Sequence, residues 1–148
     1  MRHELRTEIE IAAPPEVVWR ELTDLAAYAS WNPFITTATG TLATGDRLTL
    51  RMQPPGGKGI TFRPTVTALE PARLLEWLGH LGVKGVFDGR HRFELHPTAT
   101  GTRLVQSESF RGLLVRPMRR ALDTGTLAGF HAMNEALARR ITDHHAAA

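Results

Sequence analysis

Residues 115–141, VRPMRRALDTGTLAGFHAMNEALARRI, decide the fold, because they carry the one long helical pattern of the chain. Glycines 125 and 129 interrupt this pattern near its middle, and each costs about 1 kcal/mol relative to alanine inside a helix. Small residues there allow either a closer approach to the surface that the helix covers or a gap beneath it. The apolar positions recur at steps of three or four residues, as on one stripe of an α-helix: Val115, Met118, Leu122, Thr126, Phe130, Met133, Leu137 and Ile141.

Strand-like segments fill most of the chain before this helix. Residues 5–11 alternate between apolar and charged side chains, which is typical of a half-buried strand. Pro14-Pro15-Glu16 begins a short helix, because proline suits the first turn and an acid suits the positive helix end. A second short helix begins at Thr23-Asp24 and ends before Pro33. Further strands, separated by turn sequences, are expected at 34–41, 48–52, 62–68, 73–81, 87–95 and 102–110.

This order of elements predicts an α+β fold. Consecutive strands joined by short turns form an antiparallel sheet with one packed face, which the long helix has to cover. We therefore expect a curved antiparallel sheet of about seven strands wrapped round the C-terminal helix, with two short helices after the first strand. A chain of 148 residues fits one domain, expected at 1–143, with a frayed tail at 144–148.

The charge balance does not indicate a nucleic-acid partner. The chain carries 18 lysines and arginines against 15 acidic residues, a formal charge of +3. A nucleic-acid site needs the charge concentrated on one face together with a recognisable motif. The densest cluster, Arg111, Arg116, Arg119 and Arg120, is interpreted as a solvated helix face.

Other site chemistries have no sequence support. The chain has no cysteine, which excludes disulfides and thiolate nucleophiles. The histidines are scattered without metal-binding spacing, and Gly56-Gly57-Lys58-Gly59 lacks the spacing of a phosphate-binding loop. We therefore expect no metal and no cofactor. The N-terminal sequence has no hydrophobic run for a signal peptide or a membrane span, so we expect a cytoplasmic protein without membrane insertion.

Several segments resemble the START-like (SRPBCC) superfamily, the polyketide cyclase/dehydrase and lipid transport group, in an uncharacterised bacterial branch. The resemblance implies a helix-grip fold with a hydrophobic cavity between the sheet and the long helix. Members include lipid carriers, hormone receptors, aromatic-polyketide cyclases and a co-chaperone, so the fold does not decide the function. The segments that carry it are 11–19 (IAAPPEVVW), 22–24 (LTD), Tyr28, 31–34 (WNPF), 87–93 (FDGRHRF), 106–112 (QSESFRG) and 133–137 (MNEAL).

Three polar residues are expected on the cavity face of neighbouring strands. A turn at 97–101 places His91 opposite Gln106, give or take two residues, with Glu108 on the same face. His91 and Glu108 among aromatic side chains are then candidates for a general acid–base pair. The other interpretation is a buried polar network that holds the sheet register. Asn134 is a further polar candidate on the helix, with a solvent-exposed position as its alternative.

The expected function is binding of a small hydrophobic ligand, lipid-, aromatic- or polyketide-like, in this cavity. The alternatives are a cyclase/dehydratase-like enzyme that uses His91 and Glu108, and an interaction module that uses the exposed sheet or the arginine cluster. The ligand and the oligomeric state are left open by the sequence. With the polar trio, the expected lining residues, many of which core packing alone would also explain, are Trp31, Phe34, Met52, Phe62, Trp77, Phe87, Phe93, Phe110, Met118, Leu122 and Phe130.

Overall fold

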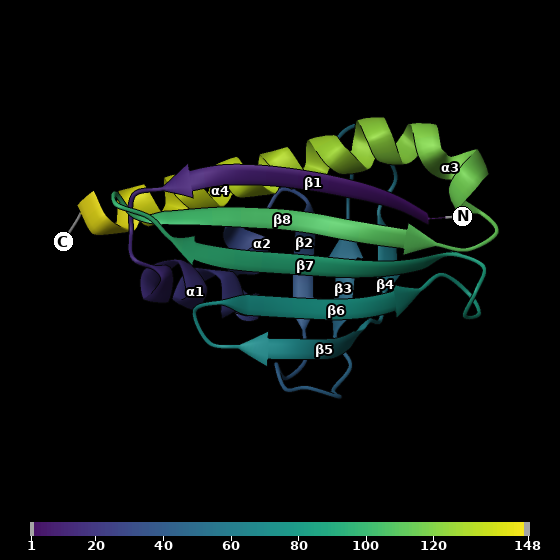
Figure 1. Ribbon diagram of the computed structural model, residues 1–148, viewed down its shortest axis with the longest axis horizontal. Coiled ribbons are helices and arrows are strands. Elements are labelled where there is room, and N and C mark those ends of the chain that lie inside the picture. The colour runs from purple at the N-terminus through teal and green to yellow at the C-terminus, as the bar shows by residue number, and fades with distance from the viewer. Residues whose placement is uncertain (1, 147–148) are drawn as a thin grey trace.

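The computed structural model describes residues 2–146, and its main element is a five-stranded antiparallel sheet (Figure 1). The strand order is β1-β8-β7-β6-β5, so the four strands that follow one another in sequence are joined as hairpins and β1 pairs with β8. The first and the last strand in the sequence thus lie side by side in one sheet. The strands are β1 (Arg2–Ile11), β5 (Thr65–Glu70), β6 (Leu74–His80), β7 (Asp88–Pro97) and β8 (Thr102–Arg111).

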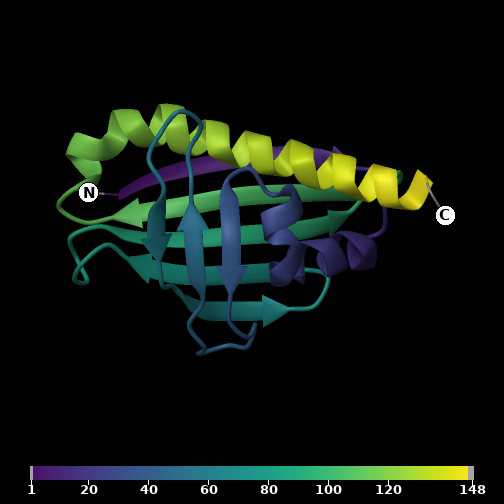
Figure 2. The same ribbon diagram turned by 180° about the vertical axis from the view of Figure 1, so that it is seen from behind.

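A second, three-stranded antiparallel sheet faces the first. It contains β2 (Ile35–Thr39), β3 (Thr49–Met52) and β4 (Ile60–Phe62), whose strands run across those of the large sheet (Figure 2). Figure 2 also shows that the small sheet and the C-terminal helix cover the same face of the large sheet. The space between these three parts contains the hydrophobic core.

The break between the two sheets lies at Pro64. Residues 62–68, expected as one strand in which Pro64 suggests an edge position or a bulge, instead form the end of β4 and the start of β5, which belong to different sheets. Proline has no N–H to donate to a strand partner, so it interrupts the ladder, while its carbonyl oxygen accepts from the Leu48 N–H at 2.9 Å. The α+β helix-grip fold is confirmed. The expected seven strands are eight within residues 2–146, arranged in two sheets.

Two short helices follow β1, as expected. These are α1 (Pro15–Thr23) and α2 (Tyr28–Trp31), with the 3₁₀ turn η1 (Leu25–Ala27) between them. Asn32 ends α2, and its Oδ1 accepts hydrogen bonds from the N–H groups of Phe34 (3.0 Å) and Ile35 (2.9 Å). This side chain turns the chain into β2 and thereby positions Phe34.

The closing helix is continuous but not uniformly α-helical. It consists of α3 (Val115–Ala121), the π-helical turn η2 (Leu122–Thr126) and α4 (Leu127–Ala146). A π turn holds an extra residue and often occurs at functional sites. The helix continues beyond residue 143, where the domain was expected to end, and residues 147–148 lie outside those described. The predicted stripe is confirmed at six buried positions: Val115, Leu122, Phe130, Met133, Leu137 and Ile141.

The two glycines of the closing helix have different neighbours. A Cβ added to Gly129 would lie 2.3 Å from the ring of Phe34, so glycine there lets the ring pack directly on the helix backbone. A Cβ added to Gly125 would meet only the Pro54 side chain, at 3.6 Å. The helix is therefore closely packed at Gly129 and loosely covered at Gly125. Of the helices within residues 2–146, none has the length and apolar character required to cross a membrane.

Candidate functional site

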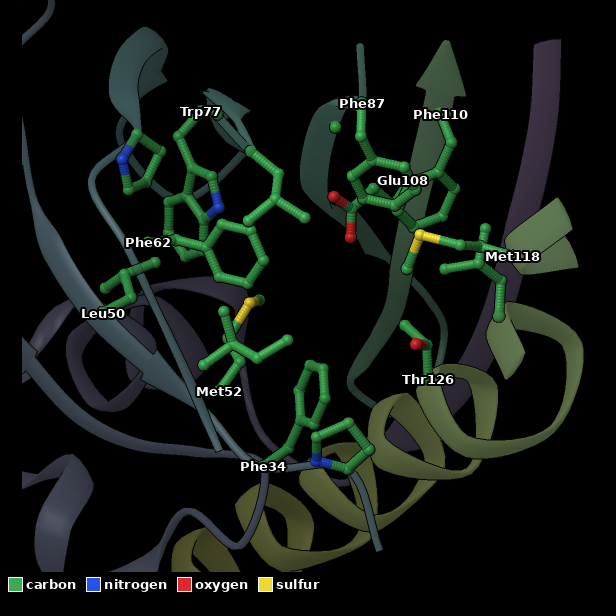
Figure 3. A pocket seen from close by; sticks show the side chains of 17 residues that line it. Phe34, Leu50, Met52, Phe62, Trp77, Phe87, Glu108, Phe110, Met118 and Thr126 are labelled. Atoms are coloured by element: carbon green, nitrogen blue, oxygen red, sulfur yellow. The ribbon is translucent and has the colours of Figure 1, made fainter. Parts of the chain in front are cut away.

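A cavity of about 100 Å³ lies between the large sheet, the small sheet and the α3–η2 part of the closing helix (Figure 3). Its wall is almost entirely apolar. The large sheet contributes aromatic side chains from β6, from β8 and from Phe87 just before β7, the small sheet contributes β3 and β4, and the helix contributes its first turns. The lining residues are Phe34, Leu50, Met52, Pro54, Ile60, Phe62, Pro64, Trp77, Gly79, Leu81, Phe87, Gly89, Glu108, Phe110, Met118, Leu122 and Thr126.

Nine of the lining residues are among those expected from the sequence. Most of them are brought together because they lie on the inward face of a strand or on the apolar stripe of the helix, while Phe34 and Phe87 directly precede β2 and β7. The other lining residues were missed, although Leu50 shares the alternation of Met52, and Thr126 lies on the helical stripe. The nine are Phe34, Met52, Phe62, Trp77, Phe87, Glu108, Phe110, Met118 and Leu122.

The other five expected residues lie outside the cavity wall. His91, Phe93, Gln106 and Phe130 are completely buried in the core next to the cavity. The His91 ring packs between Trp77 (centroids 5.2 Å apart) and Phe130 (5.0 Å), which leaves no open space around it. Trp31 packs edge-on against Tyr28, with centroids 5.2 Å apart. Inward orientation therefore placed the first four side chains in the core without exposing them to the cavity, while Trp31 is partly buried against the core.

The polar trio is close together in space. His91 lies directly opposite Glu108 in the β7–β8 register, and Phe93 opposite Gln106, two residues from the central expectation and within its range. His91 Nδ1 lies 3.0 Å from Glu108 Oε1, and His91 Nε2 lies 2.9 Å from Gln106 Oε1. The imidazole thus bridges a carboxyl group at the cavity and an amide in the core.

Backbone carbonyl groups set the direction of each hydrogen bond in this network. The Thr7 hydroxyl donates to the Gln106 carbonyl oxygen (2.9 Å), so Thr7 accepts from Asn134 Nδ2 (2.8 Å). Asn134 Oδ1 then accepts from Gln106 Nε2 (2.7 Å), which also donates to the Phe130 carbonyl oxygen (3.4 Å). Gln106 Oε1 is therefore an acceptor, and its partner, His91 Nε2, carries a hydrogen.

One further proton is shared between His91 and Glu108. With His91 Nε2 already protonated, the 3.0 Å contact between Nδ1 and Oε1 is a hydrogen bond only if one of these two atoms carries a hydrogen. The pair is then either imidazolium with carboxylate or imidazole with carboxylic acid, and is neutral as a whole in both. The His91 side chain is fully buried and that of Glu108 is 11% exposed, so water screens the pair little.

Gly89 gives the Glu108 carboxyl group access to the cavity. A Cβ at Gly89 would lie only 2.2 Å from Glu108 Oε2, so any side chain there would displace the carboxyl group. Figure 3 shows this group turned toward the cavity, with Phe87 and Phe110 beside it. The signal in the sequence was a glycine at an inward position of the alternating 87–93 segment, between Phe87 and His91. Among the side chains of residues 2–144, no group of three or more acidic or histidine residues is placed to hold a metal ion.

A curved antiparallel sheet, a closing helix and an apolar cavity between them define the class of small helix-grip proteins. Residues 2–142 match the family model described as polyketide cyclase / dehydrase and lipid transport, and the chain belongs to this family. Comparison of the sequence with curated proteins gave no match.

Solved structures show the same fold. Protein MLL2253 from Mesorhizobium loti is 26% identical, with a TM-score of 0.72, and the alignment covers 96% of this chain and 98% of that one. The Zhui aromatase/cyclase from Streptomyces sp. R1128 is 18% identical, with a TM-score of 0.79 over 96% of this chain and 94% of that one. The protein TTHA0849 from Thermus thermophilus is 17% identical, with a TM-score of 0.77 over 96% and 99%. At below 25% identity, the last two likenesses concern the fold alone.

Proposed function

We propose that this protein binds a small, neutral, mainly apolar molecule in the cavity and accepts a hydrogen bond from its hydroxyl group at Glu108. The observation that supports this most is the composition of the wall. Glu108 is the one charged side chain among the lining residues, all of which lie within residues 2–146, and its Oε2 lies over Gly89. Ligand pockets typically combine an apolar wall with a few polar groups that set the orientation of the ligand.

The neutrality of the His91–Glu108 pair favours an uncharged ligand. A charged ligand would leave a net charge in an apolar cavity, which is costly without a second compensating group. A hydroxyl group adds no charge and donates to the carboxylate, and such charge-assisted hydrogen bonds are stronger than neutral ones. The pair therefore selects for a hydrogen-bond donor that is not itself ionised.

The size of the cavity restricts how much of the ligand is enclosed. An apolar cavity of roughly 150 Å³ holds one benzene molecule, and the volume here is about 100 Å³. The space is therefore smaller than one that holds benzene, and a single small ring fits only if lining side chains move slightly. A lipid- or polyketide-like molecule needs more room, and Met52 and Met118 are the lining side chains best able to provide it, because methionine has three flexible torsions.

Binding of phenol and toluene, measured by calorimetry, tests the proposed anchor. The two molecules are similar in size, but only phenol donates a hydrogen bond, so we expect phenol to bind about tenfold more tightly. Glu108→Leu should remove this preference. Glu108→Gln is the matched control, because its amide nitrogen can donate to His91 Nδ1 while its oxygen still accepts from phenol. Equal affinities for the unmodified protein, or a preference for benzoate, would contradict the anchor.

Native mass spectrometry of freshly purified protein tests binding without a chosen ligand. A retained small molecule, lost on heating or in Leu122→Trp, which fills the cavity, would support the proposal. If no molecule is retained and neither phenol nor toluene binds, the cavity is only a packing defect and the proposal is wrong.

A second candidate function is acid–base catalysis on a polyketide-like substrate, as the family description and the aromatase/cyclase likeness suggest. The observation that favours it is the proton shared by Glu108 and the buried His91, which makes Glu108 able to give or take a proton at the cavity wall. Glu108→Gln separates the two functions. It should retain binding and abolish turnover if the protein is an enzyme, whereas a binding protein shows no turnover with either residue.

A further inference from the structure

Exposed aliphatic side chains gather at one end of the molecule. Leu113 is 81% exposed, Val83 69% and Leu114 40%. They come from the β6–β7 and β8–α3 connections, which Figure 1 shows at the same end of the large sheet, away from the C-terminus. Hydrogen bonds join the two connections, since the Leu113 N–H donates to Gly85 O (3.2 Å) and the Leu114 N–H to Val86 O (2.9 Å). We call Val83, Leu113 and Leu114 the apolar tip.

Part of the backbone of the apolar tip is internally paired. The Val86 N–H donates to Val83 O at 3.3 Å, and the Gly85 N–H donates to the Asp88 carboxylate at 3.1 Å. Gly112 lies so close to the neighbouring connection that an added Cβ would be 2.4 Å from Val86 O. Unpaired backbone groups oppose entry into an apolar medium. The paired N–H groups of Gly85, Val86, Leu113 and Leu114 lower this cost.

Basic side chains surround the apolar tip. Lys84 directly follows Val83 in the sequence. Four arginines lie on the β8 and α3 side: Arg111, Arg116, Arg119 and Arg120. Arg2 is next to Arg111 in the sheet register. Three acids, Glu4, Asp88 and Asp123, lie at the same end. The six cations and three acids together give this end a formal charge of +3, as large as that of the whole chain.

The three acids at this end are already engaged. Glu4 pairs with Arg2 (2.9 Å), Asp123 with His3 (2.6 Å) and Asp88 with His80 (2.7 Å). Burial alone would raise the pKa of Asp88, but the hydrogen bonds from His80 and the Gly85 N–H outweigh it and lower this pKa. The arginines on α3 thus have few acids to neutralise them; Asp123 lies 3.9 Å from Arg119.

We propose that the apolar tip and its basic surround dock on an anionic lipid surface. Aliphatic side chains next to lysine and arginine are the features that bind proteins to membrane interfaces, where the chains enter the acyl boundary and the cations meet the headgroups. A protruding tip of three aliphatic side chains offers little for a protein partner, whose surface would have to match its shape. A lipid surface accepts such a tip without a complementary shape.

The docking end adjoins the cavity. Leu81 and Phe87 flank the β6–β7 connection, Phe110 and Met118 flank the β8–α3 connection, and all four line the cavity. A docked molecule would therefore hold its cavity next to the lipid surface, suited to taking up an apolar ligand from it. The docking proposal stands on exposure and charge alone, and it holds or fails independently of the proposed ligand.

Sedimentation with vesicles tests the proposal. The protein should bind vesicles of phosphatidylcholine and phosphatidylglycerol in equal parts, and not vesicles of phosphatidylcholine alone. Arg116→Gln, Arg119→Gln and Arg120→Gln together should weaken binding about a hundredfold, at roughly fivefold for each arginine. The control with the same net charge changes exposed arginines away from the tip, and it should bind within about threefold of the unmodified protein: Arg20→Gln, Arg103→Gln and Arg139→Gln.

The apolar contribution has its own test. Leu113→Ser should weaken vesicle binding about tenfold, since it removes one side chain that enters the acyl region. A polarity-sensitive dye on Leu113→Cys, in a chain with no other cysteine, should report an apolar environment on anionic vesicles. The same dye on Ala99→Cys, an exposed position in the β7–β8 turn, should report none.

Several outcomes would overturn the proposal. These are absence of binding to anionic vesicles, equal loss in the tip and control triple variants, or binding unaffected by Leu113→Ser, which would mean unspecific charge attraction. Without vesicle binding, a concentration-dependent dimer that Leu113→Ser dissolves in analytical ultracentrifugation would assign the tip to a second copy of the chain instead.

Discussion

The two halves of the space beneath the closing helix differ, although the same strands, β7 and β8, form the floor of both. Under α4, His91, Gln106 and Phe130 are completely buried and connected by hydrogen bonds and aromatic contacts. Under α3 and η2, Phe87 and Phe110 face a cavity. Residues in or directly before the same strands, with the same inward parity, therefore end in a filled core or in a cavity wall, depending on what the opposite layer supplies.

Phe34 marks the boundary between the two halves. Its ring packs on Gly129 and lies edge-on to Phe130, with centroids 5.6 Å apart, while it also lines the cavity. No comparable side chain packs on Gly125, whose nearest neighbour is Pro54. The difference between two glycines, one turn apart, thus accounts for where the core ends and the cavity begins.

Replacing Phe130 with alanine should have the largest effect on this contrast. The change removes a fully buried ring from the filled half, and such truncations cost about 3–5 kcal/mol of unfolding free energy. Phe62→Ala is the matched change in the cavity wall, where the ring is half-buried, and we expect a cost of about 1–2 kcal/mol. Chemical denaturation compares the two, and equal losses would show that the two halves are packed alike.

Gln106→Leu should have the next largest effect. It leaves the N–H of His91 Nε2 and the Asn134 oxygen without partners in a buried site, at an expected cost of about 2–4 kcal/mol. Thr126→Val changes a polar group of the cavity wall and should stay within about 0.5 kcal/mol. Thermal unfolding of both variants tests this prediction. A mild effect of Gln106→Leu would mean that the network does not hold the core.

The two glycine-to-alanine changes should have opposite signs. At Gly129 the new methyl group would collide with the buried ring of Phe34, and overpacking costs about 1–3 kcal/mol, which outweighs the gain in helix propensity. At Gly125 the methyl group meets only an ordinary contact with Pro54, so the variant should gain up to about 1 kcal/mol. Denaturant midpoints measure both, and a stabilising Gly129→Ala would place the core boundary elsewhere.

Asp88→Asn should have the smallest effect, and it should make the free energy of unfolding less dependent on pH. The pKa of Asp88 is lowered in the folded protein, so its stabilisation is complete above the pKa of the unfolded chain and is lost as pH falls through the folded pKa. We expect a loss of about 1 kcal/mol at neutral pH that disappears in acid. Unfolding curves at several pH values would contradict this if the difference persisted below both pKa values.

Much of the fold and part of the site were predictable from residue patterns. Alternation in 87–95 and 102–110 placed His91, Gln106 and Glu108 on one face, and the register differed from its central expectation by two residues. The pattern could not separate Glu108, in the cavity wall, from His91 and Gln106, in the core. Alternation indicates which face of the sheet a side chain points to. Whether the space above that side chain is filled depends on the opposite layer, including Phe34 and Phe130. The split of the sheet at Pro64 was missed because the alternation of 62–68 continues through it, whereas 60–62 pairs with the strand before it and 65–70 with the strand after it, in different sheets.

The sequence by itself determined the closing helix, its buried stripe, the antiparallel strands and the inward face of each, because periodicity and turn residues act locally. Only the tertiary structure decided what happens between sheet and helix. There, a ring on Gly129 and a chain of hydrogen bonds anchored on backbone carbonyls fill one half, while a π turn and Gly89 leave a carboxyl group facing a cavity in the other. These outcomes depend on the volumes and polar groups of residues that meet only when the chain is folded.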